Sequence, residues 1–144
     1  YQQSFAGHTL ALLGLESSDT LREDLLFLQN FYGWMTESQA NWSQTFFDWF
    51  CGKESEKRAA NSPQSHLYSE ASFEPVRAIL MSRTPLRPER LKAPYFQRLT
   101  PAHLEVDLVE TLWAPIAEQD DWGPFQQHLD LIDQARLAYD WSGR

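Results

Sequence analysis

The chain has 144 residues, of which 42% are hydrophobic and 14% aromatic, so it can bury a core of its own and is not expected to be disordered. Its 20 acidic and 12 basic side chains give a net charge of −8, which argues against a protein that binds nucleic acid or anionic membranes through bulk electrostatics. The single cysteine excludes an internal disulfide framework, and no apolar run reaches the roughly 20 residues of a membrane-spanning helix.

Helical spacing dominates the first third of the chain. Residues 2–14 carry apolar side chains at helical steps and end in Gly14, a residue type that often closes a helix. Thr20 and Glu23 fit a capping box, in which each side chain accepts a hydrogen bond from a backbone N–H at the helix start. From Leu21 to Met35 the apolar residues recur every three or four positions, which predicts an amphipathic helix.

A second, aromatic-rich helix is predicted from Ser38 to Phe50. Trp42, Phe46 and Trp49 fall on one stripe of this helix, and we expect them in the core rather than in an aromatic cage. If Trp42 is a core residue, its replacement by alanine should cost about 3–5 kcal/mol. Gly52 follows, and it could adopt the left-handed conformation that closes a helix.

The middle of the chain is expected to be irregular on both sides of one short helix. Residues 53–72 are polar and rich in serine, which predicts a loop-rich stretch. Glu74–Met81 carries apolar residues at helical spacing and predicts the short helix. Between residues 82 and 100 three prolines interrupt any regular element, which predicts a Pro-rich connector.

The final third returns to helical spacing. Thr100-Pro101 is typical of a helix start, and the apolar face that follows consists of Leu104, Leu108, Val109, Leu112, Trp113 and Ile116. A last amphipathic helix is predicted from Trp122-Gly123-Pro124 to about Tyr139. Because no strand pattern occurs, we predict an all-α fold, a small irregular bundle of about five to six helices. The whole of residues 1–144 is expected to form a single, soluble, cytoplasmic helical domain.

Charge is unevenly distributed along the chain. Residues 73–100 hold six of the twelve basic side chains and only two acidic ones, whereas the segments on either side are acidic. We call these six residues the basic belt: Arg77, Arg83, Arg87, Arg90, Lys92 and Arg98. The belt is expected to pair with acidic helices of the same chain. The alternative is a surface that binds phosphate or an acidic partner.

Candidate catalytic groups are few. His8, His66, His103 and His128 are scattered without metal-ligand spacing. Cys51 precedes Gly52 at an expected helix end, where the helix dipole raises the pKa of a thiol, so we expect a buried structural residue rather than a nucleophile.

A cluster of acids is the remaining candidate site. Glu118, Asp120 and Asp121 could hold a metal or act as general acid and base. Acids before a helix are favoured by capping alone, however, and we expect that structural role.

Six short stretches, met in order along the chain, carry a family resemblance. In the first half these are Tyr1-Gln2-Gln3, Leu13-Gly14-Leu15, Asp24-Leu25-Leu26 leading to Met35, and Asn41-Trp42-Ser43-Gln44-Thr45-Phe46. In the second half they are Ala93-Pro94-Tyr95-Phe96 and Ala117-Glu118-Gln119-Asp120-Asp121-Trp122, with Phe125 and Leu129 after them. In order and spacing they resemble the C-terminal region of the selenoprotein-O family, also called the YdiU family.

Members of that family are pseudokinase-like protein adenylyltransferases, which use ATP with magnesium or manganese to move AMP onto hydroxyl side chains of other proteins. Their nucleotide- and metal-binding residues lie in a kinase-like portion upstream of the region that this chain resembles. The resemblance therefore implies no catalytic, cofactor-binding or metal-binding residue here. It implies a helical C-terminal accessory domain that contacts the upstream kinase-like domain, and a chain that is the C-terminal part of a longer one.

Two other interpretations stay open. The chain could be a stand-alone helical protein–protein interaction module without catalysis, with the aromatic side chains or the basic belt as its partner surface. It could also be a small enzyme with a site assembled from Glu118, Asp120, Asp121 and a histidine. None of the three interpretations involves nucleic acid or a membrane as partner.

Overall fold

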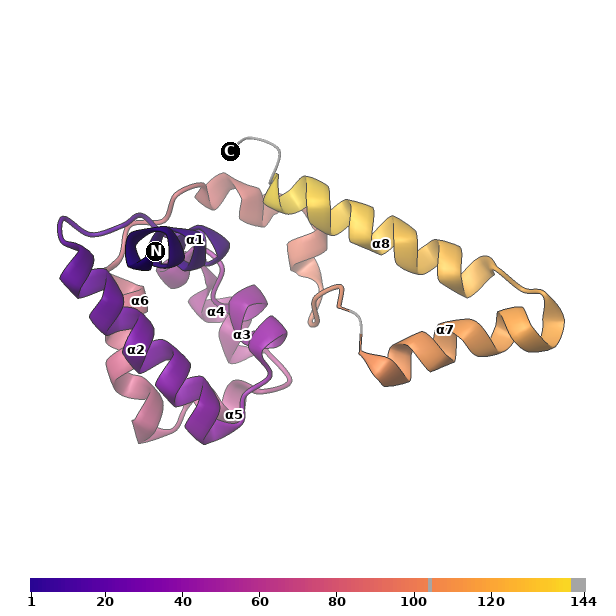
Figure 1. Cartoon of the computed structure of the whole chain (residues 1–144), viewed down its shortest axis with the longest axis horizontal. Helices are drawn as coiled ribbons and strands as arrows, with labels where there is room; N and C mark the ends of the chain where they lie inside the picture. The colour runs from indigo at the N-terminus through magenta and orange to yellow at the C-terminus, as the bar shows by residue number, and fades with distance from the viewer. Residues whose placement is uncertain (104, 141–144) are drawn as a thin grey trace. The chain divides into compact units, whose positions relative to one another are not determined.

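The regular structure of the chain is helical throughout. The computed structural model describes residues 1–103 and 105–140, and over these residues it contains eight α-helices, four short 3-10 helices and no β-strand (Figure 1). The prediction of an all-α fold is confirmed. The helices fall into two compact units, Tyr1–Leu91 and Lys92–Arg144. The prediction of a single domain over residues 1–144 stays a prediction.

The first two helices form as the sequence predicts. Helix α1 spans Gln2–Leu12, and α2 spans Leu21–Ser38. The hydroxyl of Thr20 accepts a 3.3 Å hydrogen bond from the backbone N–H of Glu23, which is the first half of the predicted capping box. Gly14 follows α1 with a φ of 63°, so the chain leaves the helix in the left-handed conformation that glycine tolerates.

Helix α3 is shorter than predicted and spans Trp42–Asp48. The side chain of Asn41 caps it by accepting a 2.9 Å hydrogen bond from the backbone N–H of Gln44. After the helix, Cys51 and Gly52 both have positive φ values, 65° and 55°. The prediction of a left-handed Gly52 is confirmed, and the turn begins one residue earlier than expected.

The expectation that Trp42 lies in the core is wrong. Its side chain is 49% exposed, because Trp42 is the first residue of α3 and stands at the rim of the core. Its indole still contacts Tyr32, with ring centroids 5.2 Å apart. Trp49, on the same stripe, is fully buried as predicted.

Residues 53–72 are more helical than the predicted loop. They contain η1 (Gly52–Ser55), α4 (Glu56–Ala60), α5 (Ser65–Tyr68) and η2 (Ala71–Phe73). Each of these pieces is at most five residues long, below the length at which hydrophobic periodicity can be recognised. Their helical turns raise the helix number above the predicted five to six.

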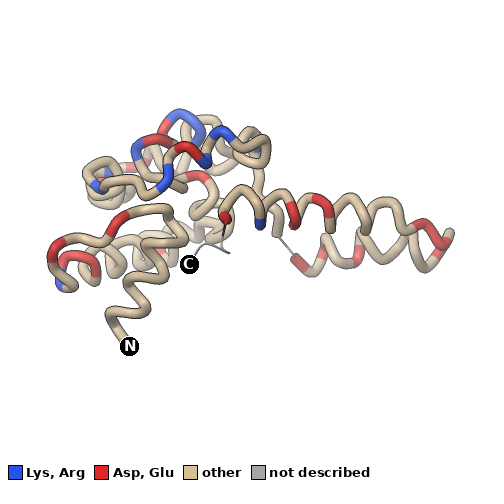
Figure 2. Tube along the Cα trace, turned by 90° about the horizontal axis from the view of Figure 1, so that it is seen from above, with Lys and Arg blue, Asp and Glu red and all other residues tan. Residues whose placement is uncertain are grey.

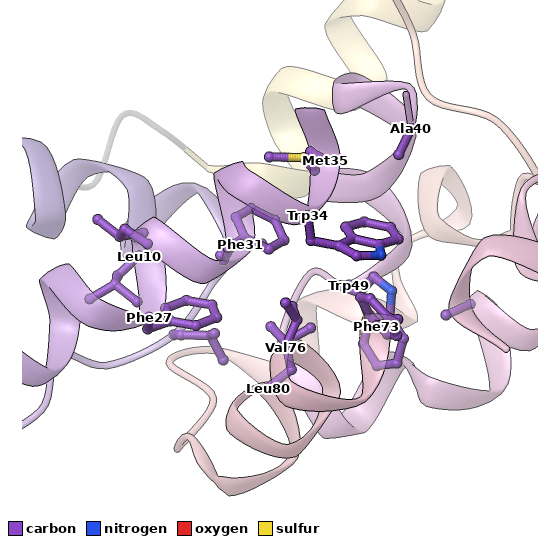
Figure 3. Packing of buried hydrophobic residues seen from close by; sticks show 14 of the residues in the cluster. Leu10, Phe27, Phe31, Trp34, Met35, Ala40, Trp49, Phe73, Val76 and Leu80 are labelled. Carbon is purple, nitrogen blue, oxygen red and sulfur yellow. The ribbon is translucent and has the colours of Figure 1, made fainter. Parts of the chain in front are cut away.

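The core of the first unit lies between α1, α2 and α6 (Glu74–Ser82) and the chain around α3 (Figure 3). An aromatic cluster occupies one end of this core. The ring centroid of Phe73 lies 4.6 Å from that of Trp34 and 5.3 Å from that of Trp49. Tyr68 lies against the same cluster, with its ring 5.1 Å from that of Phe73. The short segment around η2 therefore supplies a central core residue.

The connector after α6 is irregular, as its prolines predict. The backbone N–H of Leu86 donates a 2.8 Å hydrogen bond to the carbonyl of Gly14, and that of Glu16 donates to the carbonyl of Thr84 at 3.0 Å. This isolated β-bridge ties the loop after α1 to the loop after α6. Two 3-10 helices follow, η3 (Pro88–Lys92) and η4 (Pro94–Gln97).

The second unit contains η4, α7 (Val106–Gln119) and α8 (Gly123–Tyr139). Helices α7 and α8 form an antiparallel hairpin (Figure 1). At the base of α8 the ring of Tyr139 packs against Tyr95 and Phe96, at centroid distances of 5.7 and 5.1 Å. The unit's small core is therefore at the η4 end of α8.

The predicted helix start at Thr100-Pro101 is wrong. Helix α7 begins at Val106, because the backbone before it is held in another conformation. The N–H of Ala102, which a helix cap at Thr100 would need, donates a 2.9 Å hydrogen bond to the hydroxyl of Tyr95 instead. Leu104, predicted on the apolar face of this helix, lies outside the described residues.

Candidate functional site

The predicted acidic cluster lies at the turn between α7 and α8. Asp120 ends α7 with a φ of 52°, and its carboxylate accepts a 3.0 Å hydrogen bond from the indole N–H of Trp122. Asp121 accepts a 2.9 Å hydrogen bond from the backbone N–H of Gly123. Glu118 is exposed on α7. Asp120 and Asp121 therefore order the turn, which is the structural role expected of them.

The four histidines lie on separate elements: His8 on α1, His66 on α5, His103 before α7 and His128 on α8. The ring of His103 lies 3.6 Å from the carboxylate of its neighbour Glu105. Within residues 1–103 and 105–140, no three side chains of the histidine, cysteine, aspartate or glutamate type are grouped so that they could hold a metal ion. Within those residues, Glu118, Asp120 and Asp121 therefore form no metal site with a histidine, and a general acid–base role for them stays a hypothesis.

Cys51 is fully buried at the end of the α3 segment. Burial raises the pKa of its thiol to about 11, and its Sγ donates a hydrogen bond to the carbonyl of Arg87. A thiol with such a pKa is protonated at neutral pH and is not a nucleophile. The predicted structural role fits this environment, but burial rather than the helix dipole is the main cause.

Two members of the basic belt form ion pairs within the first unit. Arg77 on α6 pairs with Glu56 on α4. Arg83 donates a 2.5 Å hydrogen bond to Asp24 on α2, and the two side chains are only 11% and 5% exposed. For these two arginines the intramolecular interpretation of the belt is confirmed. A partner surface on the remaining belt residues stays a prediction.

The first unit contains a buried polar network that no sequence pattern predicts. The hydroxyl of Tyr68 donates a 2.7 Å hydrogen bond to one carboxylate oxygen of Asp48, and the amide of Gln44 donates to the other at 2.8 Å. The amide of Gln64 donates in turn to the hydroxyls of Tyr68 and Thr45, at 2.7 and 2.8 Å. Tyr68 and Gln64 come from the segment around α5, which the sequence assigns to a loop.

The charge states of this network follow from its burial. Burial raises the pKa of Asp48 above its ordinary 3.8, and the hydrogen bonds from Ser62, Tyr68 and Gln44 offset the rise only in part. Burial and the neighbouring Asp48 carboxylate also raise the pKa of Tyr68. Since these side chains bond to one another, the network fixes α5 onto α3.

An apolar cleft of about 370 Å³ lies between α7 and α8. Its walls are Val109, Leu112, Trp113 and Ile116 from α7, Phe125, His128, Leu129 and Ile132 from α8, and Trp122 from the turn. The α7 and α8 residues recur at three- and four-residue steps, so each helix turns one continuous apolar stripe toward the cleft. Trp113 is 61% exposed, and Val109, Trp122 and Leu129 are also exposed. The sequence predicts these stripes but assigns them to a core.

The helices around the cleft are strongly acidic. Residues 105–140 contain nine aspartate or glutamate residues and one basic residue, Arg136. Figure 2 shows the acidic positions along both helices of the hairpin. Glu110 and Asp133, both exposed, directly follow the cleft residues Val109 and Ile132 in the sequence. The cleft is therefore an apolar surface in a negative electrostatic field.

One polar atom of the cleft wall is unsatisfied. The Nε2 atom of His128 is buried and has no hydrogen-bond partner among the described residues. A buried polar atom without a partner is unfavourable, and a polar group of a bound molecule is able to satisfy it.

No helix in the described part of the chain is both long enough and apolar enough to cross a membrane. Comparisons of the chain with protein-family models, with curated proteins and with solved structures find no match. The resemblance to the selenoprotein-O family therefore stays a prediction.

Proposed function

We propose that the chain is a helical protein-interaction domain that binds another polypeptide in the cleft between α7 and α8. The observation that carries this proposal is the exposure of the cleft's large apolar side chains, above all Trp113. Contiguous exposed apolar surface of this kind marks binding sites, because water contact with it is unfavourable. Within the described residues, no group of three histidine, cysteine, aspartate or glutamate side chains that could hold a metal ion accompanies it.

Two kinds of polypeptide fit this proposal. If the resemblance to the selenoprotein-O family holds, the chain is an accessory domain and the cleft binds the kinase-like domain of the same adenylyltransferase, whose active site lies outside this chain. In the alternative, the chain is a stand-alone module and the cleft binds a separate protein. The coding sequence upstream of Tyr1 separates them, since a kinase-like segment there favours the accessory domain and a nearby start codon favours the module.

Selection from a displayed peptide library tests the proposal. The full chain serves as target, and the affinities of selected peptides are measured by calorimetry against Trp113→Asp and Leu129→Asp. Both substitutions place a charge on the cleft wall and should abolish binding. Leu26→Asp is a matched control, since Leu26 is 58% exposed on α2, in the other unit. Peptides that bind all four proteins equally, or a selection that yields no binder, would overturn the proposal.

A further inference from the structure

We infer that the occupant of the cleft is an amphipathic helix of a partner protein, with an apolar face flanked by lysine or arginine side chains. This inference rests on the proposed function, because it specifies the chemistry of the polypeptide that binds in the same cleft. It is carried by three features of the hairpin: the direction of its apolar stripes, the sign of its charge and the unsatisfied ring of His128.

The shape of the cleft favours a helix. Its two walls are the facing stripes of antiparallel helices of 14 and 17 residues, about 20–25 Å long at a rise of about 1.5 Å per residue. A third helix laid along such a groove places its own apolar residues between both stripes and completes a small bundle. An occupant of three to four turns matches the length of the hairpin.

The negative charge of the hairpin favours basic side chains on either side of the apolar face of the bound helix. With nine acidic residues and one arginine over residues 105–140, the rims attract basic side chains and repel acidic ones. Glu110 and Asp133 lie next in sequence to cleft residues and are exposed, so their charges act on cations that flank an apolar face. Asp133 also accepts a 3.2 Å hydrogen bond from Arg136, and both groups of this pair are exposed. Long lysine and arginine stems can also cover the outer parts of the exposed indoles.

The same charge argues against other occupants. A second copy of the chain would bring two acidic hairpins together, and like charges in close contact are unfavourable. Nucleic acid and anionic lipid carry the same sign of charge as the hairpin, so the field repels them as well. A basic helix is the occupant for which the apolar stripes and the field act in the same direction.

His128 adds a polar contact to the apolar ones. Its unpartnered Nε2 atom lies in the α8 wall of the cleft. A partner helix that carries a hydroxyl or amide side chain on its apolar face would satisfy this nitrogen and gain orientation from it. We therefore expect the apolar face of the bound helix to carry one such residue.

The test compares three synthetic helical peptides of about 18 residues that share one leucine face and differ only in their flanks, which are lysine, glutamine or glutamate. Fluorescence anisotropy of the labelled peptides gives their affinities for the full chain. We expect the lysine peptide to bind about tenfold or more tightly than the glutamine peptide, and the glutamate peptide to bind most weakly. The difference should shrink at about 1 M salt, where the Debye length falls to about 3 Å.

A charge reversal checks that the rims of the cleft cause this order. The double variant Glu110→Lys/Asp133→Lys leaves seven acidic and three basic residues over residues 105–140, so it should narrow the difference in affinity between the lysine and glutamate peptides. The matched control Asp19→Lys/Glu37→Lys changes the net charge equally at exposed positions of the first unit and should leave that difference unchanged. Circular dichroism confirms that the helices of each variant are intact.

The outcomes separate this inference from the proposed function. Equal affinities for all three peptides, lost in Trp113→Asp, would overturn the basic helix and leave the polypeptide-binding cleft in place. No binding of any peptide would overturn both. Dimers in sedimentation that Trp113→Asp dissociates would identify a second copy as occupant, and retention on neutral phosphatidylcholine vesicles that depends on Trp113 would identify a membrane. Either result would overturn the inference.

Discussion

Arg83, the residue after α6, donates a hydrogen bond to Asp24 on α2, and together they form an almost fully buried ion pair across the first unit. The backbone N–H of Ser18 donates a second hydrogen bond of 3.0 Å to the same carboxylate oxygen. The pair thus joins the loop before α2 to the end of α6. It also gives one arginine of the basic belt a purely structural role.

Asp24→Asn should lower the free energy of unfolding at pH 7 by about 3–5 kcal/mol, because the substitution leaves the Arg83 cation buried without its anion. Urea unfolding followed by tryptophan fluorescence measures this change. Asp19→Asn, an exposed substitution in the same loop, should change the stability by less than about 0.5 kcal/mol. Equal effects of the two substitutions would contradict a role for the buried pair.

The same pair should produce an acid-dependent loss of stability. Burial alone would raise the pKa of Asp24, but the hydrogen bonds from Ser18 and Arg83 and the charge of Arg83 outweigh it and hold the pKa below its ordinary 3.8. The folded state therefore binds this proton less tightly than the unfolded state does. The stabilisation is complete well above pH 3.8 and is lost as the pH falls through the lower pKa of the folded state. The difference between the wild type and Asp24→Asn should shrink over this range, and a constant difference would contradict the lowered pKa.

Asp48 should show the opposite dependence on pH. Because burial raises its pKa above 3.8 in the folded state, the folded state holds this proton more tightly than the unfolded state does. Its contribution to stability therefore falls as the pH rises from about 3.8 through the raised pKa, and is constant above it. Asp48→Asn removes this titration, so its stability relative to the wild type should increase over the same range. Denaturant unfolding between pH 4 and pH 8 measures the two curves, and a relative decrease for Asp48→Asn would contradict the raised pKa.

Trp42 and Trp49 provide a comparison of a rim and a core tryptophan in the same segment. Trp49→Ala should cost about 3–5 kcal/mol, since the side chain is fully buried in the aromatic cluster. Trp42→Ala should cost about 1–2 kcal/mol, because its indole is half exposed and loses mainly the contact with Tyr32. Chemical denaturation of both variants measures the difference. Equal losses would place Trp42 in the core after all.

The success of the sequence predictions follows the length of each element. Helix α2 has 18 residues, so its apolar spacing repeats several times and can be recognised in the sequence, as can its N-cap residue Thr20. Helix α5 has only four residues and owes its position to Tyr68, whose hydroxyl reaches Asp48 far away in the sequence. Such a long-range contact produces no local sequence pattern, which is why the sequence predicts a loop where α5 lies.

The cleft illustrates a different limit of the sequence. The spacing of Val109, Trp113 and Ile116 correctly predicts one apolar face on a helix. Periodicity reports which residues share a face, but not what covers that face, and here the described residues leave it open. The observed start of α7 differs from the predicted one for a related reason, because the hydroxyl of Tyr95 accepts the N–H of Ala102 that a helix cap at Thr100 would need.

Replacing either of the glycines with positive φ, Gly14 or Gly52, should lower the free energy of unfolding, by different amounts. A Cβ atom at Gly52 would lie 2.7 Å from the backbone carbonyl oxygen of Leu80, and one at Gly14 would lie 2.8 Å from a ring carbon of Phe50. Both positions also have positive φ, which costs a non-glycine residue about 1–2 kcal/mol. We expect each alanine variant to lose about 2–4 kcal/mol in total, with Gly52→Ala the worse because a backbone oxygen cannot move aside as a ring can.

Two helical glycines serve as matched controls for these variants. Gly7 on α1 and Gly33 on α2 have nothing within 4 Å of the added methyl group. Because glycine lowers helix stability, Gly7→Ala and Gly33→Ala should raise the free energy of unfolding by about 0.5–1 kcal/mol. Thermal unfolding of all four variants followed by circular dichroism gives the comparison. Similar shifts for the two pairs would mean that the turns after α1 and α3 do not have the left-handed backbone described here.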